Sequence, residues 1–339
     1  MQQKSPDGYF PGRKDLRISL TTKCDYRCAH CHAEGNNKPW DQGVCATPTI
    51  AEIEQLIEET ARRGAKSVRF TGGEPAVYVH ILDLLSRTQE WALAYPTITC
   101  WGINTNGAAL VKNKKLRGVL LESALQDLVI GLDSVRPDQK SKLDTPIGVS
   151  GQALLRDLNP LTQEWLTTPW RRLKFNVVYV GQWDETRVRE VIEAALRLGA
   201  EVGIIELIGS RSSTLRYEFE AFRTTEAARL GLEAQYREVV DQTHLTDWRG
   251  RDVVRFYQDH CHDMVIDSAG QRIGCNACRR IHLRVGPIAD GLGAIPCPFE
   301  NPRKMIPITH GGTLVPGSVE DALHLNGRGP SWAIGTKYE

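Results

Sequence analysis

Three cysteines near the N-terminus form the tightest cluster of potential ligands in the sequence. Cys24, Cys28 and Cys31 follow a C-x3-C-x2-C spacing. Thiolates are the usual protein ligands of iron–sulfur clusters, and full ligation by protein takes four of them. Three therefore predict a [4Fe–4S] cluster whose fourth iron stays open to another ligand. The alternative is a structural zinc site, for which His30 or His32 would have to close the coordination from within the same short loop.

A glycine-rich loop follows further along the chain. Thr71-Gly72-Gly73-Glu74-Pro75 comes directly after an apolar run at 67–70 that reads as a strand, so the loop lies at the C-terminal end of that strand. Glycine lets a backbone approach a ligand closely, and Glu74 can accept a hydrogen bond from an ammonium group. The alternative is an ordinary turn.

A second set of cysteines lies in the C-terminal part of the chain. Cys275, Cys278 and Cys297 give a C-x2-C pair followed by a later cysteine. Such a pair can chelate one metal centre, and Cys261 could close the site as a fourth ligand. A second [4Fe–4S] cluster and a zinc ribbon both fit this pattern.

Composition narrows the class of protein. The 339 residues are 41% hydrophobic and carry a net charge of +1 from 42 basic and 41 acidic side chains, which predicts neither a nucleic-acid polymer nor a membrane as partner. We expect a cytoplasmic protein, because no long apolar stretch occurs and the N-terminal residues lack the apolar core of a secretory signal. Nine cysteines, six of them in two tight sets, fit reduced thiols better than disulfides. Cys45 and Cys100 are interpreted as buried or loop thiols.

The segments around these loops alternate between strand-like and helix-like patterns. The expected strands are 16–20, 67–71, 97–103, 127–132, 173–180 and 201–206. The expected helices are 50–64, opened by a capping box at Thr49 and Glu52, and those near 78–92, 109–122 and 185–198. Six strands with intervening helices predict an α/β fold, a partial (β/α)6 TIM-like barrel whose chemistry gathers at the C-terminal strand ends.

The alternation stops after Glu206. We expect a connecting segment at 210–225, a helix at 226–240, and an irregular tail from about 244 that is rich in glycine, proline and cysteine. This predicts two domains, a partial barrel over 1–240 and an irregular C-terminal iron–sulfur domain over 241–339.

The combination of motifs resembles the radical S-adenosylmethionine (SAM) superfamily and, within it, the GTP 3′,8-cyclase (MoaA) family of molybdenum-cofactor biosynthesis. The likeness runs from about residue 15 to residue 300. Besides both cysteine sets it rests on Leu16-Arg17-Ile18-Ser19, Arg69 to Pro75, Asn104 to Gly107, Leu132-Asp133-Ser134, Lys174-Phe175-Asn176 and Ile205-Glu206. The resemblance implies an enzyme with two [4Fe–4S] clusters that cleaves SAM at the first and holds a small-molecule substrate near the second, with a reductant such as flavodoxin or ferredoxin.

The resemblance also implies roles for single residues. The implied metal ligands are Cys24, Cys28, Cys31, Cys275, Cys278 and Cys297. The implied cofactor-side residues are His30, Gly72, Gly73, Glu74, Pro75, Asn106 and Asp133, although Asn106 and Asp133 are also typical turn residues. The implied substrate-side residues are Arg69, Asn104, Lys174, Arg280 and His282. Arg17 is the catalytic candidate between radical and substrate, or else part of a salt bridge.

Several positions depart from the cyclase pattern. Gly203 and Ser67 stand where that family has phosphate-binding cations, and His282 replaces a fixed positive charge with one that titrates near neutral pH. These departures argue against GTP as the substrate, because they remove charges that would bind its triphosphate. We therefore expect a nucleotide-like or specialised-metabolite substrate. Two alternatives remain, the GTP cyclase itself and a single-cluster enzyme with a zinc tail that acts on a peptide or protein.

Overall fold

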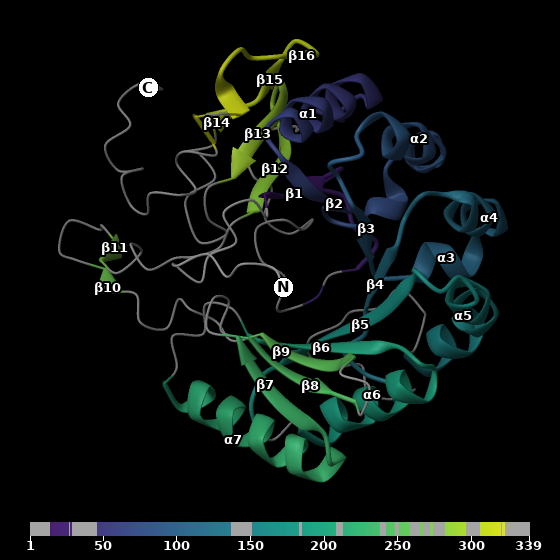
Figure 1. Cartoon of the computed structure of the whole chain (residues 1–339), viewed down its shortest axis with the longest axis vertical. Coiled ribbons are helices and arrows are strands. Elements are labelled where there is room, and N and C mark those ends of the chain that lie inside the picture. Colours follow the sequence, from purple (N-terminus) through teal and green to yellow (C-terminus); the bar gives the residue numbers. More distant parts are fainter. Residues whose placement is uncertain are drawn as a thin grey trace.

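The architecture is known from a computed structural model of the chain. The structure describes residues 14–26, 28, 46–136, 151–182, 185–207, 213–237, 242–247, 251–257, 265–266, 272–273, 282–295, 306–319 and 321–322. Within these ranges the chain is a mixed α/β fold built around one large sheet (Figure 1). None of the described helices has the length and hydrophobicity needed to cross a bilayer.

Six parallel strands in sequence order form the middle of the sheet. They are β1 (Lys14–Ser19), β2 (Ala65–Thr71), β3 (Cys100–Thr105), β4 (Asp127–Gly131), β5 (Arg172–Tyr179) and β6 (Glu201–Glu206). The helices between them are α1 (Ile50–Arg62), α2 (Ile81–Ala94), α3 (Ala108–Lys112), α4 (Lys114–Glu122), α5 (Gly151–Leu166) and α6 (Glu185–Arg197). Figure 1 shows these strands following an arc with the helices outside it. The expected α/β class and its parallel strands are confirmed.

Helix α1 illustrates how local sequence defines an element. Thr49 caps its N-terminus by accepting from the Glu52 N–H, and the Glu52 carboxylate accepts from the Thr49 N–H in return. This capping box satisfies N–H groups that have no partner within the helix. The face that carries Ile53, Leu56 and Ile57 is fully buried, so the expected helix is confirmed.

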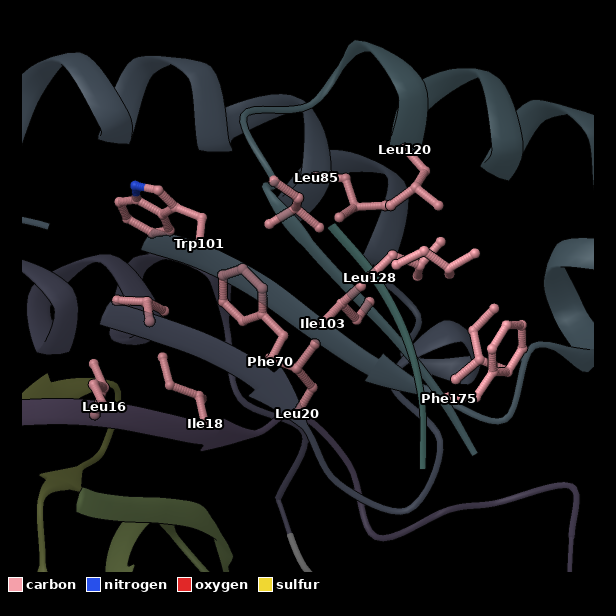
Figure 2. Packing of buried hydrophobic residues seen from close by; sticks show 14 of the residues in the cluster. Leu16, Ile18, Leu20, Phe70, Leu85, Trp101, Ile103, Leu120, Leu128 and Phe175 are labelled. Atoms are coloured by element: carbon pink, nitrogen blue, oxygen red, sulfur yellow. The ribbon is translucent and has the colours of Figure 1, made fainter. Parts of the chain in front are cut away.

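The core lies between the sheet and the outer helices. Figure 2 shows Phe70, Trp101, Ile103, Leu128 and Phe175 extending from the strands among the helical side chains. Burial of each large apolar side chain contributes roughly 1.5–3 kcal/mol. Because side chains alternate across a strand, their neighbours in sequence lie on the opposite, inner face of the sheet. That inner face carries most of the polar residues considered below.

Two expectations about helices were incomplete. Helix α5 was not expected between β4 and β5, because Pro160 inside it interrupts the helical pattern. It nevertheless buries Leu154, Leu158, Leu161 and Trp165 at helical spacing. The helix expected at 109–122 is divided into α3 and α4 at residue 113, whose side chain accepts from the Leu116 N–H as the N-cap of α4.

The helix expected at 226–240 is wrong. The chain forms α7 (Ser213–Leu230) earlier and then strand β7 (Glu233–Arg237). Phe219 and Phe222, one turn apart on α7, are buried against Tyr179 and Phe256. This aromatic contact fixes the helix where a connecting segment was expected, and Gly231, with φ of 60°, ends it.

The expectation of an irregular tail is wrong for several segments, because tail strands extend both edges of the sheet. At one edge β9 (Asp252–Tyr257) pairs parallel to β6 and is followed by β8 (Gln242–Thr246) and β7. At the other edge β12 (His282–Ile288) pairs parallel to β1 and is followed by β13 (Gly291–Ile295) and β14 (Ile306–Pro307). Four short strands form separate pairs, β10 (Val265–Ile266) with β11 (Arg272–Ile273) and β15 (Thr309–His310) with β16 (Thr313–Leu314).

The last described segment also docks on α1. The Thr309 hydroxyl donates to the buried Glu52 carboxylate at 2.7 Å, and the Leu314 N–H donates to Gln55 Oε1 at 3.0 Å. The tail is thus tied to the helix that follows the cysteine loop. The division into two domains at residue 240 stays a prediction.

Candidate functional site

The cysteine loop and the glycine-rich loop run side by side beyond the ends of their strands. The pairing of β1 and β2 continues as the Leu20 N–H donates to the Thr71 carbonyl at 2.8 Å and the Gly73 N–H to the Thr21 carbonyl at 2.7 Å. The Glu74 N–H then donates to the Lys23 carbonyl at 2.7 Å. These bonds hold the glycine-rich loop against the backbone that leads directly into Cys24.

The two glycines are required by this close approach. A Cβ atom at Gly72 would lie 2.5 Å from the Thr21 carbonyl oxygen, and one at Gly73 would lie 2.2 Å from that of Lys23. Gly72 also has φ of 143°, a backbone conformation that residues with a Cβ atom rarely adopt. Contact between the two loops therefore explains the glycine pair, in addition to any approach to a ligand.

Glu74 is buried beneath the two loops and joins them to a third. One carboxylate oxygen accepts from the Thr105 hydroxyl at 2.6 Å and the Ala76 N–H at 2.9 Å, and the other accepts from the Asn106 N–H at 2.6 Å. Burial raises the pKa of Glu74 to about 7, against the lowering effect of these bonds. The expected role of Glu74 toward an ammonium group stays a prediction, since three donors of the chain already use this carboxylate.

Asn106 completes a junction of three loops. Its side-chain amide donates to Asp25 Oδ1 at 2.6 Å and lies 4.0 Å from Cys24 Sγ, while its oxygen accepts from the Ala108 N–H. The loops after β1, β2 and β3 thus meet around Cys24. Pro75, at the start of a short 3-10 helix capped by Glu74, lies in the same junction.

The described part of the cysteine loop fits an iron–sulfur cluster. The thiols of Cys24 and Cys28, both potential metal ligands, are half-buried. The Tyr26 N–H donates a hydrogen bond to Cys24 Sγ at 3.3 Å. Backbone N–H donors to sulfur are one means by which proteins stabilise thiolate ligands of such clusters. The predicted third ligand, Cys31, and the cofactor candidate His30 lie outside the described residues.

Arg69, a predicted substrate residue, belongs to a charge cluster on the inner face that is centred on the buried Asp127. It donates to Asp127 Oδ2 at 2.6 Å and to Asn104 Oδ1 at 3.2 Å, and Arg172 donates to both Asp127 oxygens. Burial would raise the pKa of Asp127, but the two guanidinium groups lower it below its ordinary value. Burial and the same carboxylate raise the pKa of the Cys100 thiol to about 11. Arg69 and Asn104 therefore lie together, and their predicted substrate role stays a prediction.

Lys174, the next predicted substrate residue, contacts a residue that the sequence did not single out. Its Nζ donates to the Tyr257 hydroxyl at 2.9 Å and lies 5.0 Å from the centre of that ring. Next to Tyr257, Arg255 forms an ion pair with Glu201 at 3.2 Å. The alternating pattern at 252–257 would have indicated a strand, but nothing in it indicates that this strand pairs with β6.

The remaining predicted residues are spread along the sheet. Asp133, just beyond β4, accepts from the Val178 N–H through its side chain and from Arg187 through its carbonyl, so it fixes the end of β4 against β5. Arg17 on β1 is half-buried and is aligned with Arg69 on β2. His282 begins β12 opposite Asp15.

Several other predictions fall outside the described residues and stay predictions. They concern Arg280 and the cysteines Cys45, Cys261, Cys275, Cys278 and Cys297.

Comparison with known proteins identifies the family of the N-terminal part. Residues 18–154 match the model of the radical SAM superfamily. The chain is also similar to proteins named GTP 3′,8-cyclase. It is 29% identical to that of Alkaliphilus metalliredigens (strain QYMF) over 67% of this chain and 66% of the relative. It is 24% identical to that of Pseudomonas fluorescens (strain Pf0-1) over 82% of this chain and 79% of the relative.

A third cyclase, from Clostridium perfringens (strain SM101 / Type A), is 30% identical over 57% of this chain and 55% of the relative. The chain thus spans about half to two thirds of the length of several of these relatives. The matched region includes all three loops of the junction around Cys24.

Solved structures show a similar fold. Streptococcus suis SuiB bound to precursor peptide SuiA has a TM-score of 0.60 at 14% identity, covering 96% of this chain and 66% of that chain. Native anSMEcpe with bound AdoMet has a TM-score of 0.55 at 14% identity, covering 91% and 82%. At such low identity these likenesses concern the fold alone. Residues 18–154 thus match the radical SAM superfamily, and the chain is similar to GTP 3′,8-cyclases.

Proposed function

We propose that this chain is a radical SAM enzyme that cleaves SAM reductively and takes a hydrogen atom from a nucleotide-like or specialised-metabolite substrate. The observation that carries the proposal is the junction of the cysteine, glycine-rich and Asn106 loops. It brings Cys24 to the C-terminal end of the parallel strands, where α/β folds of this kind place their chemistry. Relatives named GTP 3′,8-cyclase support a nucleotide-like substrate.

The cysteine loop would hold a [4Fe–4S] cluster through Cys24, Cys28 and Cys31. When bound, this cluster would supply the electron that cleaves SAM. The backbone of Gly72 and Gly73 packs directly against the backbone of this loop at Thr21 and Lys23. Asn106 and Glu74 orient the surrounding backbone through their hydrogen bonds.

The inner face of the sheet would hold the substrate. Arg17, Arg69 and Asn104 extend from β1, β2 and β3 on this face, and we propose that Arg17 lies between SAM and substrate. We further propose that the parallel strands form a partial (β/α)6 barrel, because a closed wall would keep water away from a radical. The electron would come from a reductant such as flavodoxin or ferredoxin.

We propose that Cys275, Cys278 and Cys297 hold a second [4Fe–4S] cluster at the opposite end of the strands. In the sequence, Cys278 precedes β12 by four residues and Cys297 follows β13 by two. The N-terminal end of β12 lies beside Asp15 of β1. The C-terminal end of β13 pairs with this same end of β12, through Ile295 and Arg284. Four residues span at most about 14 Å. This topology supports a cluster near the N-terminal end of β1, across the inner face from Cys24.

The test of SAM cleavage is substitution of the three cysteines. Each of Cys24→Ala, Cys28→Ala and Cys31→Ala should abolish 5′-deoxyadenosine formation after reduction with dithionite, because loss of one thiolate unseats the cluster. Cys100→Ala, which changes a half-buried thiol on β3, is the matched control and should retain the activity. Full product from any of the three variants would contradict the proposal.

Metal analysis tests the second cluster. We expect about eight irons per chain on anaerobically purified protein, the sum for two [4Fe–4S] clusters. About four irons and one zinc would instead support the zinc tail and an enzyme with a single cluster. If Cys261→Ala halves the iron content, the second cluster is ligated entirely by protein, and an open iron for the substrate is wrong.

A further inference from the structure

The inner face near β5, β6 and β9 carries a side-chain arrangement that sequence motifs did not indicate. Strand register places Gly203 of β6 opposite Arg255 of β9, and Ile205 opposite Tyr257. Because side chains alternate along a strand, these positions lie on the same face as Lys174 and Asn176 of β5. Gly203 is the position where the cyclase pattern has an arginine.

The space next to Gly203 is already occupied. A Cβ atom there would lie 2.4 Å from Asn176 Oδ1 and 3.0 Å from Tyr257 Cε2. A longer cationic side chain at this position would therefore require both neighbours to move. Tyr257 and Asn176 fill part of the volume that a cation would otherwise use.

The cations around this position already have acceptors within the sheet. Lys174 donates to the Tyr257 hydroxyl at 2.9 Å, and Arg255 pairs with Glu201 at 3.2 Å. Burial raises the pKa of Tyr257, but the positive charges of Lys174 and Arg255 outweigh it and lower the pKa below its ordinary value, in keeping with two cations close to the phenol oxygen. Tyr257 takes one of the three N–H donors of Lys174 and holds the ammonium group at the sheet, so a phosphate there would compete with Tyr257 for this group.

Asn176 adds an acceptor at the same place. Its Oδ1 is buried and has no hydrogen-bond partner among the residues that the structure describes. A carbonyl oxygen repels phosphate oxygens and favours an N–H or O–H donor of a ligand. Asn176 and Tyr257 therefore both disfavour a phosphate group at this place.

We propose that Tyr257 is a specificity-determining residue of the substrate site, which holds the ammonium of Lys174 within the sheet and so selects a substrate of low negative charge over a polyphosphate. This inference rests on the proposed function, because it takes the inner face as the substrate site. It assigns to β9, a strand from the tail, a part in substrate choice.

The probe is inorganic tripolyphosphate, titrated calorimetrically into the anaerobically purified full chain. Tyr257→Phe keeps the ring and removes the acceptor of Lys174. Its affinity for tripolyphosphate should exceed that of the unaltered chain by about tenfold to a hundredfold, the range that corresponds to one charge-assisted hydrogen bond. Tyr217→Phe, which alters an exposed tyrosine on α7, should cause no change.

A double-mutant cycle with Lys174→Gln identifies the group responsible. The substitution should remove the gain in the Tyr257→Phe background and should leave the affinity of the unaltered chain for tripolyphosphate unchanged. Equal affinity of Tyr257→Phe and the unaltered chain would overturn the proposal. If Tyr257→Phe fails to fold, the single variant Lys174→Gln decides. If it binds tripolyphosphate markedly more weakly than the unaltered chain does, Lys174 already binds the anion and the proposal is wrong.

The same preparations also separate this inference from the proposed function. They are assayed for 5′-deoxyadenosine formation without substrate. If no product forms, the radical SAM activity is wrong, whereas the tripolyphosphate titrations still decide the role of Tyr257.

Discussion

At the scale of single residues, one buried carboxylate organises the junction around Cys24. Glu74 is 1% exposed and accepts from Thr105, Asn106 and Ala76, which belong to two different loops. A carboxylate buried to this extent is costly to ionise. Its hydrogen bonds compensate only in part, which is why its pKa is raised to about 7.

The raised pKa makes the stability of the junction depend on pH. Above the ordinary pKa of 4.5 the unfolded chain loses this proton, but the folded chain keeps it up to about pH 7. Stability contributed by Glu74 is therefore lost as the pH rises through 7. Between pH 6 and pH 8 the unaltered chain should lose about 1.4 kcal/mol relative to Glu74→Gln, which does not titrate.

Thermal melting of both proteins under anaerobic conditions at the two pH values measures this difference, which corresponds to a few degrees in Tm. Other titrating groups are common to both proteins and cancel in the comparison. A constant difference in Tm between pH 6 and pH 8 would show that Glu74 has an ordinary pKa.

At the scale of elements, the site depends on how two loops pack after adjacent parallel strands. The β1–β2 hydrogen bonds continue through residues 20–23 and 71–74, beyond both strands. This continuation requires glycine at 72 and 73 because the backbones approach so closely. The cysteine loop is therefore positioned by main-chain contact with its neighbour.

Gly73→Ala tests this packing. The added methyl group would lie 2.2 Å from the Lys23 carbonyl oxygen, and overpacking of this kind costs about 1–3 kcal/mol. We expect a loss of bound iron and of 5′-deoxyadenosine formation, measured on anaerobically purified protein. Gly118→Ala on α4 is the matched control, because its Cβ would meet nothing within 4 Å. Normal iron content in Gly73→Ala would show that the loops can separate without cost.

At the scale of the whole molecule, the tail and the N-terminal part share one sheet. Strands β9 and β12 extend the parallel strands at both edges, and the tail docks on α1 through Glu52 and Thr309. The tail therefore contributes Tyr257 and Arg255 to the inner face next to Lys174. With the inner face as the proposed substrate site, both parts of the chain would contribute to substrate choice.

The charge of the inner face leads to a prediction about GTP. Positions 67 and 203 carry Ser67 and Gly203 instead of cations, and Ser67 donates to Asp15 at 2.6 Å. Each missing charge-assisted contact to phosphate weakens binding by roughly 1.5–3 kcal/mol, so two lower the affinity by about two to four powers of ten. We expect no efficient conversion of GTP to a 3′,8-cyclised product.

The assay is anaerobic turnover with GTP, SAM and dithionite, followed by chromatography of the cyclised nucleotide or its fluorescent pterin derivative. A cyclase of established activity run in parallel confirms that the assay works. Stoichiometric product with a micromolar KM would restore the GTP cyclase as the function of this chain.

The sequence by itself determined the features that depend on near neighbours. The spacing of Cys24, Cys28 and Cys31 and the Gly72-Gly73-Glu74 loop indicated the superfamily, and capping and periodicity located α1 and the six parallel strands. These signals are local because a cap or a strand is defined within a few residues. The same local reasoning missed α5 and placed α7 too late, since tertiary packing of Trp165, Phe219 and Phe222 outweighed a weak local pattern.

Only the tertiary structure decided which side chains meet on the inner face. Arg69 reaches Asp127 across 58 residues of sequence, and Lys174 reaches Tyr257 across 83. Such contacts depend on strand order and register, and a shift of one residue would turn every one of these side chains to the other face. Because β9 pairs with β6 as well as with β8 of the tail, Tyr257 lies beside Lys174, and the physical reason is long-range strand pairing that no local pattern encodes.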